Sequence, residues 1–282
     1  MMPTQTPPLT RPEHVTVKQP GAGRASARLL VVVALVSLIS ACATDVSGRG
    51  AEGAPSLAVQ KLALNPTNGG QLVDAAALKA GDIILTAENS LKSASIQLIT
   101  LSPVSHAAVY LGNSEVVEAV GEGIRKRTMR DLLAEEATVV AFRHPEFAPQ
   151  HFAGMNTFVD KHIGQKYNYF GIMLQAPFAI ERRLCELPLM PSALRDLCIR
   201  GIAAVQLGLG RNDRFFCSQF VLEAYKSAGL PLTDADPRLI NPGDLLHMRE
   251  GDVPSVRIHR ALQYVGHLKS PPSLEVASQT SR

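Results

Sequence analysis

The stretch Arg214-Phe-Phe-Cys-Ser-Gln-Phe-Val-Leu-Glu-Ala-Tyr225 (RFFCSQFVLEAY) carries the clearest structural signal in the chain. Counted from Cys217, the positions +3, +4, +7, +8 and +11 all hold residues that favour burial: Phe220, Val221, Ala224, Tyr225 and Ala228. This spacing predicts a helix with one buried stripe. The outer face is expected to carry the polar residues of the stretch and its continuation, Ser218, Gln219, Glu223, Lys226 and Ser227.

Cys217 falls in the first turn of this helix, on the side that faces the core. Asp213 is a suitable cap for the start of the helix, and Gly229 with Pro231 is a suitable end. A free cysteine in such a place often behaves as a small buried hydrophobe. The first turn also gathers unpaired backbone N–H groups and positive dipole, which favour the thiolate. The stretch alone leaves both interpretations open.

The charge of the chain gives no sign of a nucleic-acid partner. The chain has 282 residues, of which 46% are hydrophobic, enough for one sizeable core. Its net charge of +3 comes entirely from residues 1–41, which hold four basic residues and one acidic residue. The remainder carries 24 basic and 24 acidic residues and is therefore neutral overall.

An apolar run near the N-terminus indicates export. Leu29 to Ile39 (LLVVVALVSLI) follows several arginines and is too short to span a membrane. The following Ser40-Ala41-Cys42 resembles a bacterial lipobox, which implies that residues 1–41 are a signal peptide and that Cys42 is lipidated. Ala43 follows the cysteine, and the enterobacterial sorting pattern then implies retention at the outer membrane, facing the periplasm. The alternative is a buried helix that ends at an unrelated cysteine.

The remaining cysteines are informative in an oxidising compartment. Cys185 and Cys198 are close in sequence and are candidates for a disulfide. A loop of that size would contribute roughly 3 kcal/mol of stability. Both could instead be buried free thiols. In either case Cys217 has no evident partner, and a single thiol in an exported protein needs a chemical explanation.

The pattern of the chain indicates one folded domain between two less regular ends. Residues 42–72 are small, polar and rich in Gly and Pro, and are expected to form a flexible tether. Residues 73–268 form the expected domain, with a helical insertion at 171–210, and residues 269–282 have a disorder-like composition. Strands are expected at 83–86, 106–111, 116–120, 138–142 and 255–264, helices at 73–79, 95–101, 130–136 and 154–162, and a loop at 241–244. This order predicts an α+β fold with a mostly antiparallel sheet.

Two polar residues interrupt these apolar strands. His106 opens one strand, and Glu118 lies inside the next. An unpaired buried carboxylate is costly, so Glu118 needs a partner, and His106 is the nearest candidate. An odd number of loop residues between the strands would place both side chains on one face, whereas a two-residue turn at 112–113 would separate them. The sequence permits both arrangements, and we expect the odd loop.

Cysteine, histidine and glutamate together form the set that nucleophilic acyl transfer requires. A thiolate attacks, an imidazole moves the proton, and a carboxylate fixes the imidazole tautomer. The same side chains can bind zinc, but no C-x-x-C or H-x-x-x-H spacing supports a metal site. We therefore expect no metal and no organic cofactor.

The order of short motifs resembles a known family. The chain contains Gly81-Asp-Ile-Ile84, Ser105-His106, Val117-Glu-Ala119, Gly164-Gln-Lys-Tyr-Asn168 and Phe216-Cys-Ser-Gln219. This order is similar to that of circularly permuted NlpC-type papain-like proteins, and within them to the YaeF/YiiX-like branch, over roughly residues 78–250. The resemblance implies a helix bearing the nucleophile packed on an antiparallel, barrel-like sheet. It also implies Cys217 as nucleophile, His106 as base and Glu118 as the third polar residue.

Two tyrosines are candidates for substrate binding. Tyr167 matches a family tyrosine, although packing is the more ordinary role for such a residue. Tyr110 shares the strand parity of His106 and could line the same site.

The sequence predicts a lipid-anchored cysteine hydrolase or acyltransferase acting on an amide or ester of the cell envelope. Unpermuted NlpC endopeptidases place the cysteine before the histidine and commonly use His, Asn or Gln as the third residue. Glu118 and the 171–210 insertion therefore leave open whether the substrate is a cell-wall peptide or a lipid acyl chain. A non-catalytic envelope lipoprotein that uses the fold as a binding module is the alternative of a different class. The oligomeric state is not predicted.

Overall fold

The centre of the molecule is one antiparallel sheet. The structure is a computed structural model and describes residues 43–49, 55–61, 63–64, 71–100, 102–166, 182, 184–187, 189–207 and 216–270. The predicted signal peptide, Cys42, Tyr167, the proposed cap Asp213 and most of the C-terminal tail lie outside these residues.

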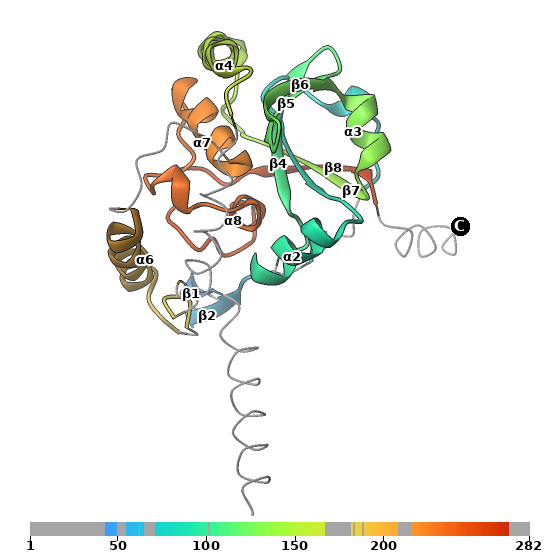
Figure 1. The fold of residues 1–282 in the computed structure, drawn as a ribbon. Helices are drawn as coiled ribbons and strands as arrows, with labels where there is room; N and C mark the ends of the chain where they lie inside the picture. Colours follow the sequence, from blue (N-terminus) through green and yellow to red (C-terminus); the bar gives the residue numbers. More distant parts are fainter. Residues whose placement is uncertain are drawn as a thin grey trace, which may run out of the picture. The chain divides into compact units, whose positions relative to one another are not determined.

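Six strands are hydrogen-bonded in the order β6-β5-β4-β3-β7-β8, and every neighbouring pair is antiparallel (Figure 1). The strands are β3 Ile83–Ala87, β4 His106–Gly112, β5 Glu115–Val120, β6 Gly123–Thr128, β7 Thr138–Arg143 and β8 Gln263–Lys269. This arrangement confirms the predicted mixed fold with an antiparallel sheet.

Some of the helices cover the two faces of the sheet. The described helices are α2 Leu91–Thr100, α3 Met129–Glu135, α4 Pro149–His162, α6 Ser192–Leu207, α7 Cys217–Ser227 and α8 Pro242–His247, with short 3-10 turns η1 Ala75–Ala77 and η2 Pro237–Leu239. Alternate residues of each strand point to opposite faces. One face, including Val109 and Val117, packs on α7 and α8, and the other, including Ala108 and Val116, packs on α3. The sheet is therefore buried on both sides.

Helix α7 has the buried stripe that its sequence predicts. Phe220, Val221, Ala224, Tyr225 and Ala228 are all buried. Helix α4 packs closely on α7 at Gly154, where any Cβ would lie 2.6 Å from the Ser227 carbonyl oxygen, so only glycine fits.

The outer face of α7 differs from the prediction at its first turn. Ser218 and Gln219 were expected in solvent but are buried. The Ser218 hydroxyl donates to the Ile240 carbonyl oxygen at 2.6 Å, because the chain that leads from η2 into α8 covers this turn. The polar and apolar spacing within one helix does not predict that a later segment of the chain will bury part of its outer face.

Four further segments differ from expectation. The helix expected at residues 73–79 is only the short 3-10 turn η1. Strand β6 was not predicted, β8 begins at Gln263 instead of at residue 255, and the expected loop at 241–244 begins helix α8. Asn241 caps α8 in a capping box with Asp244, and Pro242 occupies the first helical position. These are ordinary signals for the start of a helix. The sequence interpretation took them for a turn because a proline and a glycine are adjacent there.

Part of the segment expected to be a flexible tether is held in place. Strands β1 Thr44–Arg49 and β2 Pro55–Val59 pair antiparallel. The Thr44 hydroxyl accepts a hydrogen bond from the Leu189 N–H, and the Thr44 carbonyl accepts one from Arg195, both at 2.8 Å. These contacts with the inserted segment give the polar chain a fixed position. Among the helices that the structure describes, none is long and apolar enough to cross a bilayer.

Candidate active site

Cys217 is the first residue of α7. The N-cap is Phe216, which has no side chain able to cap, so the first-turn N–H groups are not taken by a side chain. The Cys217 side chain is buried, at 5% exposure, and is the free cysteine among the described residues. A thiol at an uncapped helix N-terminus faces backbone donors and positive dipole, both of which favour its ionised form.

His106 and Glu118 come together across the β4–β5 hairpin. His106 Nε2 lies 3.0 Å from Glu118 Oε2. The two strands pair with Ala108 opposite Glu118, so His106 is the diagonal neighbour on the same face. The same-face arrangement that we expected is therefore present.

The connection that produces this arrangement combines a short turn with a bulge. Asn113 and Ser114 form a two-residue turn, both with positive φ (50° and 61°). A register shift between Tyr110 and Gly112 inserts one extra residue into β4. The bulge supplies the odd residue that the turn lacks, and it restores the parity on which the His106–Glu118 contact depends.

Two arginines of β6 hold Glu118 from the other side. Glu118 is fully buried, and its Oε1 accepts a hydrogen bond from Arg125 Nε at 3.0 Å. Arg127 Nε lies 2.9 Å from the same oxygen, as an ion pair whose angle does not make a hydrogen bond. Burial by itself would raise the pKa of Glu118, but the hydrogen bond and charge of His106, with the two arginines, lower the pKa to about 2. Glu118 is therefore a carboxylate at neutral pH.

Cys217 and His106 interact directly and favour the ion pair. Burial opposes charge on both groups, yet their mutual hydrogen bond and attraction are stronger. The pKa of Cys217 is lowered, helped by the backbone N–H groups of Ala107 and Ser218, and the pKa of His106 is raised to about 10, helped by Glu118. Because Nε2 is engaged by Glu118, Nδ1 is the nitrogen left for the thiol. A thiolate beside an imidazolium is the state suited to nucleophilic attack.

These residues line a cavity of about 110 Å³. Its wall is built from α2, the ends of β4 and β5, β6, α3 and the first turns of α7 and α8, and includes Ser105, His106, Glu118, Arg125, Phe216, Cys217 and Pro242. The His106 side chain is 17% exposed and gives the cavity an ionisable group within reach of solvent. The wall combines charged side chains, four glutamates and two arginines, with apolar ones such as Ile96 and Phe216.

Tyr110, a predicted substrate-binding residue, does not belong to the wall described for this cavity. It shares the strand face of His106 but lies four residues, or about 13 Å, further along β4. There it packs with Ala108, Val116 and Met129, and its hydroxyl accepts the Ser114 N–H at 3.1 Å. The alternation of residues along a strand predicts which face a side chain lies on, but not how far along the strand it lies from the site.

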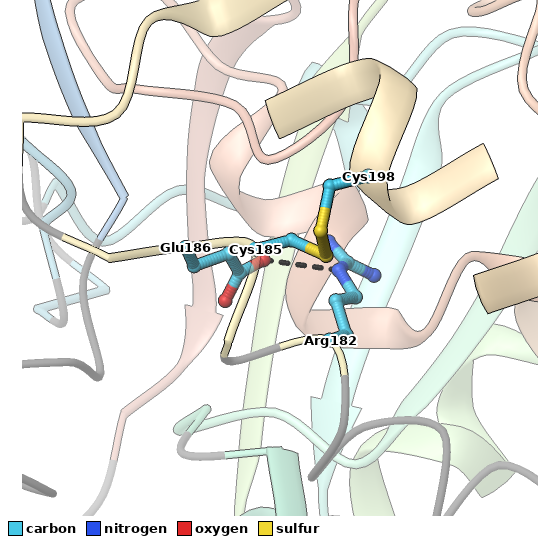
Figure 2. Close-up of a disulfide and its surroundings, with 4 residues drawn as sticks. All are labelled: Arg182, Cys185, Glu186 and Cys198. Carbon is cyan, nitrogen blue, oxygen red and sulfur yellow. Dashed lines mark hydrogen bonds and ion pairs between the residues drawn. A yellow bond between two sulfur atoms is a disulfide. The ribbon is translucent and has the colours of Figure 1, made fainter. Parts of the chain in front are cut away.

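The inserted segment is closed by an internal disulfide and is fastened to the rest of the domain by a buried arginine. Cys185 and Cys198 are joined by a disulfide, as Figure 2 shows beside Arg182 and Glu186. The Arg182 side chain is 4% exposed, donates to Glu186 at 3.0 Å and forms a two-pronged pair with Asp244 of α8. Since Pro242 begins the same helix and lines the cavity, the insertion supports one wall of the site.

Arg125 and Arg127 are the site residues that the sequence interpretation missed. They lie on β6, directly opposite Glu118 and Val116 of β5. The Arg-x-Arg alternation after Gly121-Glu-Gly123 was the available signal, since it has the period of a strand that follows a tight turn. Three consecutive basic residues obscured that period. Among the described residues, no three His, Cys, Asp or Glu side chains gather into a possible metal site.

Comparison with known proteins gives one informative relative. No family profile matches the chain. The probable lipoprotein peptidase YaeF of Escherichia coli K12 is 37% identical over 195 residues, which cover 68% of this chain and 71% of YaeF. The crystal structure of the metalloprotein YiiX from Escherichia coli O157:H7 aligns with a TM-score of 0.38 and 17% identity, over 70% of this chain and 91% of YiiX. Because identity well above 30% with YaeF extends over more than two thirds of both chains, the protein belongs to the YaeF/YiiX-like family.

Proposed function

We propose that this protein is a lipid-anchored envelope hydrolase that cleaves an amide or ester bond through a thioacyl-enzyme formed on Cys217. The observation that carries the proposal is the juxtaposition of Cys217, His106 and a buried, ionised Glu118 in one cavity. The name of YaeF, a probable lipoprotein peptidase, supports hydrolysis of a peptide-like amide. A permuted papain-like fold accounts for a nucleophile that follows its histidine in the chain.

The proposed reaction gives each member of the set a separate role. The thiolate of Cys217 attacks the carbonyl carbon, and the electron pair of the carbonyl moves onto its oxygen. The uncapped first turn of α7 offers the Cys217 N–H to that oxyanion. As the tetrahedral intermediate collapses, the C–N or C–O bond breaks and His106 transfers its proton to the leaving group. Glu118 keeps the imidazole oriented throughout.

The second half of the reaction removes the acyl group. His106, now neutral, takes a proton from water, and the resulting hydroxide attacks the thioester carbon. The S–C bond breaks, the acid is released, and the thiolate and imidazolium are restored. An alcohol or amine in place of water would make the same enzyme an acyltransferase.

Export and anchoring complete the proposal. The lipobox-like sequence ending at Cys42 and the name of YaeF support a lipoprotein of the cell envelope. A disulfide between Cys185 and Cys198 suits an oxidising compartment. We propose the outer membrane, facing the periplasm, as its location. The substrate would then be an amide- or ester-containing envelope component, with cell-wall peptide preferred over lipid.

Thiol alkylation as a function of pH tests the nucleophile. Iodoacetamide should modify Cys217 well below pH 8.5, where an ordinary thiol is still protonated. His106→Ala should remove this low-pH reactivity, while Tyr110→Phe, outside the cavity, should leave it unchanged. Alkylation of the parent protein that rises only near pH 8.5 would contradict an activated nucleophile and favour a binding module.

Intact mass measurement tests the chemistry. Incubation with peptidoglycan peptides or with phospholipid should leave an acyl mass on Cys217 with one of the two, and Cys217→Ser should abolish turnover of that substrate. Release of product by the Cys217→Ser protein would show that the thiol is not the nucleophile.

A further inference from the structure

The described surface has one concentration of exposed apolar side chains. Ten large hydrophobic residues are exposed there, and seven of them come from β2 and the segment 184–197. They are between 42% and 67% exposed and form what we call the leucine face: Leu57, Val59, Leu184, Leu187, Leu189, Leu194 and Leu197. Single exposed leucines are common on protein surfaces, but a concentration of this kind marks an interaction site.

The parts of the leucine face are held next to one another by specific contacts. Val59 pairs with Thr44 across the β1–β2 hairpin, and Thr44 accepts hydrogen bonds from Leu189 and from Arg195 of α6. The disulfide links the residue after Leu184 to the residue after Leu197. The face is therefore built from three chain segments that converge on Thr44, in the region where Figure 1 shows β1, β2 and α6.

Helix α6 presents apolar side chains on two sides. Its inner side contains the buried Arg195 and Ile199 and the half-buried Ile202. Leu194 and Leu197 are three residues apart on the opposite side, and both are more than half exposed. No part of the chain that the structure describes covers these two leucines on the outer side of α6. An exposed apolar pair of this kind is available for a contact outside the domain.

Leu189 gives an independent sign that the exposure is built in. Its backbone has a positive φ of 67°, which is unfavourable for a leucine, and its side chain is 64% exposed. The hydrogen bond from its N–H to Thr44 holds this conformation. A strained residue that projects a leucine into solvent needs a partner that uses the leucine.

We propose that the leucine face lies on the surface of a phospholipid bilayer and docks the domain beside its own anchor. The inference rests on the proposed lipidation of Cys42. Cys42 precedes Thr44 by two residues, a reach of about 7 Å, and Thr44 is fixed at the centre of the face. An acyl chain on Cys42 would therefore enter the bilayer where the leucines are concentrated. A second weak apolar contact next to a lipid anchor is the usual requirement for stable seating on a membrane.

Tryptophan reporters test the docking, because the natural chain contains no tryptophan. The full acylated chain is reconstituted in vesicles of phosphatidylethanolamine and phosphatidylglycerol, with and without bromine on the lipid tails. Leu194→Trp and Leu197→Trp place the reporter on the face, and Ile163→Trp, at the exposed C-cap of α4, is the matched control. We expect blue-shifted emission and quenching by bromolipid at positions 194 and 197, several-fold stronger than at 163.

Each outcome decides the proposal. Equal quenching at all three positions, in protein whose intact mass shows lipid on Cys42, would overturn the docking face and leave the anchor standing. If the exported full chain showed no lipid on Cys42 in its intact mass and did not bind vesicles, both the anchor and the docking would be overturned. Quenching that follows the density of protein on the vesicle, and not the bromolipid content, would assign the face to a second copy of the chain and overturn the membrane.

Discussion

Glu118 is a buried carboxylate that can influence the Cys217 thiol through His106, without contacting the thiol itself. Its two oxygens face different partners, His106 on one side and the arginines of β6 on the other. The arginines keep the carboxylate ionised although it is fully buried. The ionised carboxylate in turn stabilises the imidazolium, and the imidazolium stabilises the thiolate. Positive and negative groups therefore alternate from the arginines of β6 through Glu118 and His106 to Cys217. Removing the charge of Glu118 should raise the pKa of the Cys217 thiol.

Glu118→Gln tests this relay. The amide keeps the size of the side chain but has no charge to stabilise protonated His106, so the pKa of His106 should fall and the pKa of Cys217 should rise. At pH 6 the rate of Cys217 alkylation should fall, by about 10-fold for each unit by which the thiol pKa rises above 6. Glu122→Gln is the matched control, because Glu122 is 81% exposed and contacts Arg125 without reaching His106. An unchanged rate in Glu118→Gln would show that Glu118 only supports the fold.

At the scale of elements, the β4–β5 hairpin determines whether the site can form. A two-residue turn alone would place Glu118 on the face opposite His106, and the bulge between Tyr110 and Gly112 corrects this. The turn itself is not optimal, since Ser114 adopts a left-handed conformation that a glycine adopts without strain. Its backbone groups bond to Tyr110 and Met129, so these contacts do not depend on the serine side chain.

Ser114→Gly should therefore stabilise the protein. The expected gain is about 1 kcal/mol in the free energy of unfolding, from release of the strain at positive φ. Urea denaturation measures it, and Ser114→Ala, which keeps the Cβ, should give no gain. A stabilisation by alanine equal to that by glycine would place the cause in the lost hydroxyl and not in the backbone.

The elements that sequence reasoning located are those with a strong local period. The buried stripe of α7 is the clearest case, and β3, β4, β5 and β7 lie within one residue of their expected bounds. Strand β6 was missed because Arg125-Lys-Arg127 looks like solvated charge until its pairing with β5 is known. The cover over Ser218 and the distance of Tyr110 from the cavity also depend on contacts between distant segments. Local patterns thus located the residues of the candidate site, but neither its register nor its surroundings.

For the whole molecule, the inserted segment connects two regions that are far apart in sequence, β1 and α8. Arg195 of α6 reaches Thr44 at the start of β1, and Arg182 reaches Asp244 of α8, whose first residue lines the cavity. The disulfide between Cys185 and Cys198 closes the segment that carries both arginines. The same segment therefore supports the proposed membrane face and also the wall of the candidate active site. Arg182 is the most demanding contact, because a nearly fully buried guanidinium needs its counter-charges.

Asp244→Asn tests how much of the molecule depends on that contact. The variant keeps the shape of the side chain and its ability to accept from the Asn241 N–H, but leaves the buried Arg182 with Glu186 as its remaining carboxylate partner. Breaking a buried pair in this way should cost about 3–5 kcal/mol in the free energy of unfolding. Asp196→Asn is the matched control, since its partner Arg200 is 56% exposed and such pairs contribute about 0–1 kcal/mol. Urea denaturation of both variants in oxidising buffer gives the comparison. Equal midpoints for the two variants would mean that water or neighbouring carbonyls satisfy Arg182, and that the other contacts of the insertion, such as Arg195 with Thr44, hold it in place.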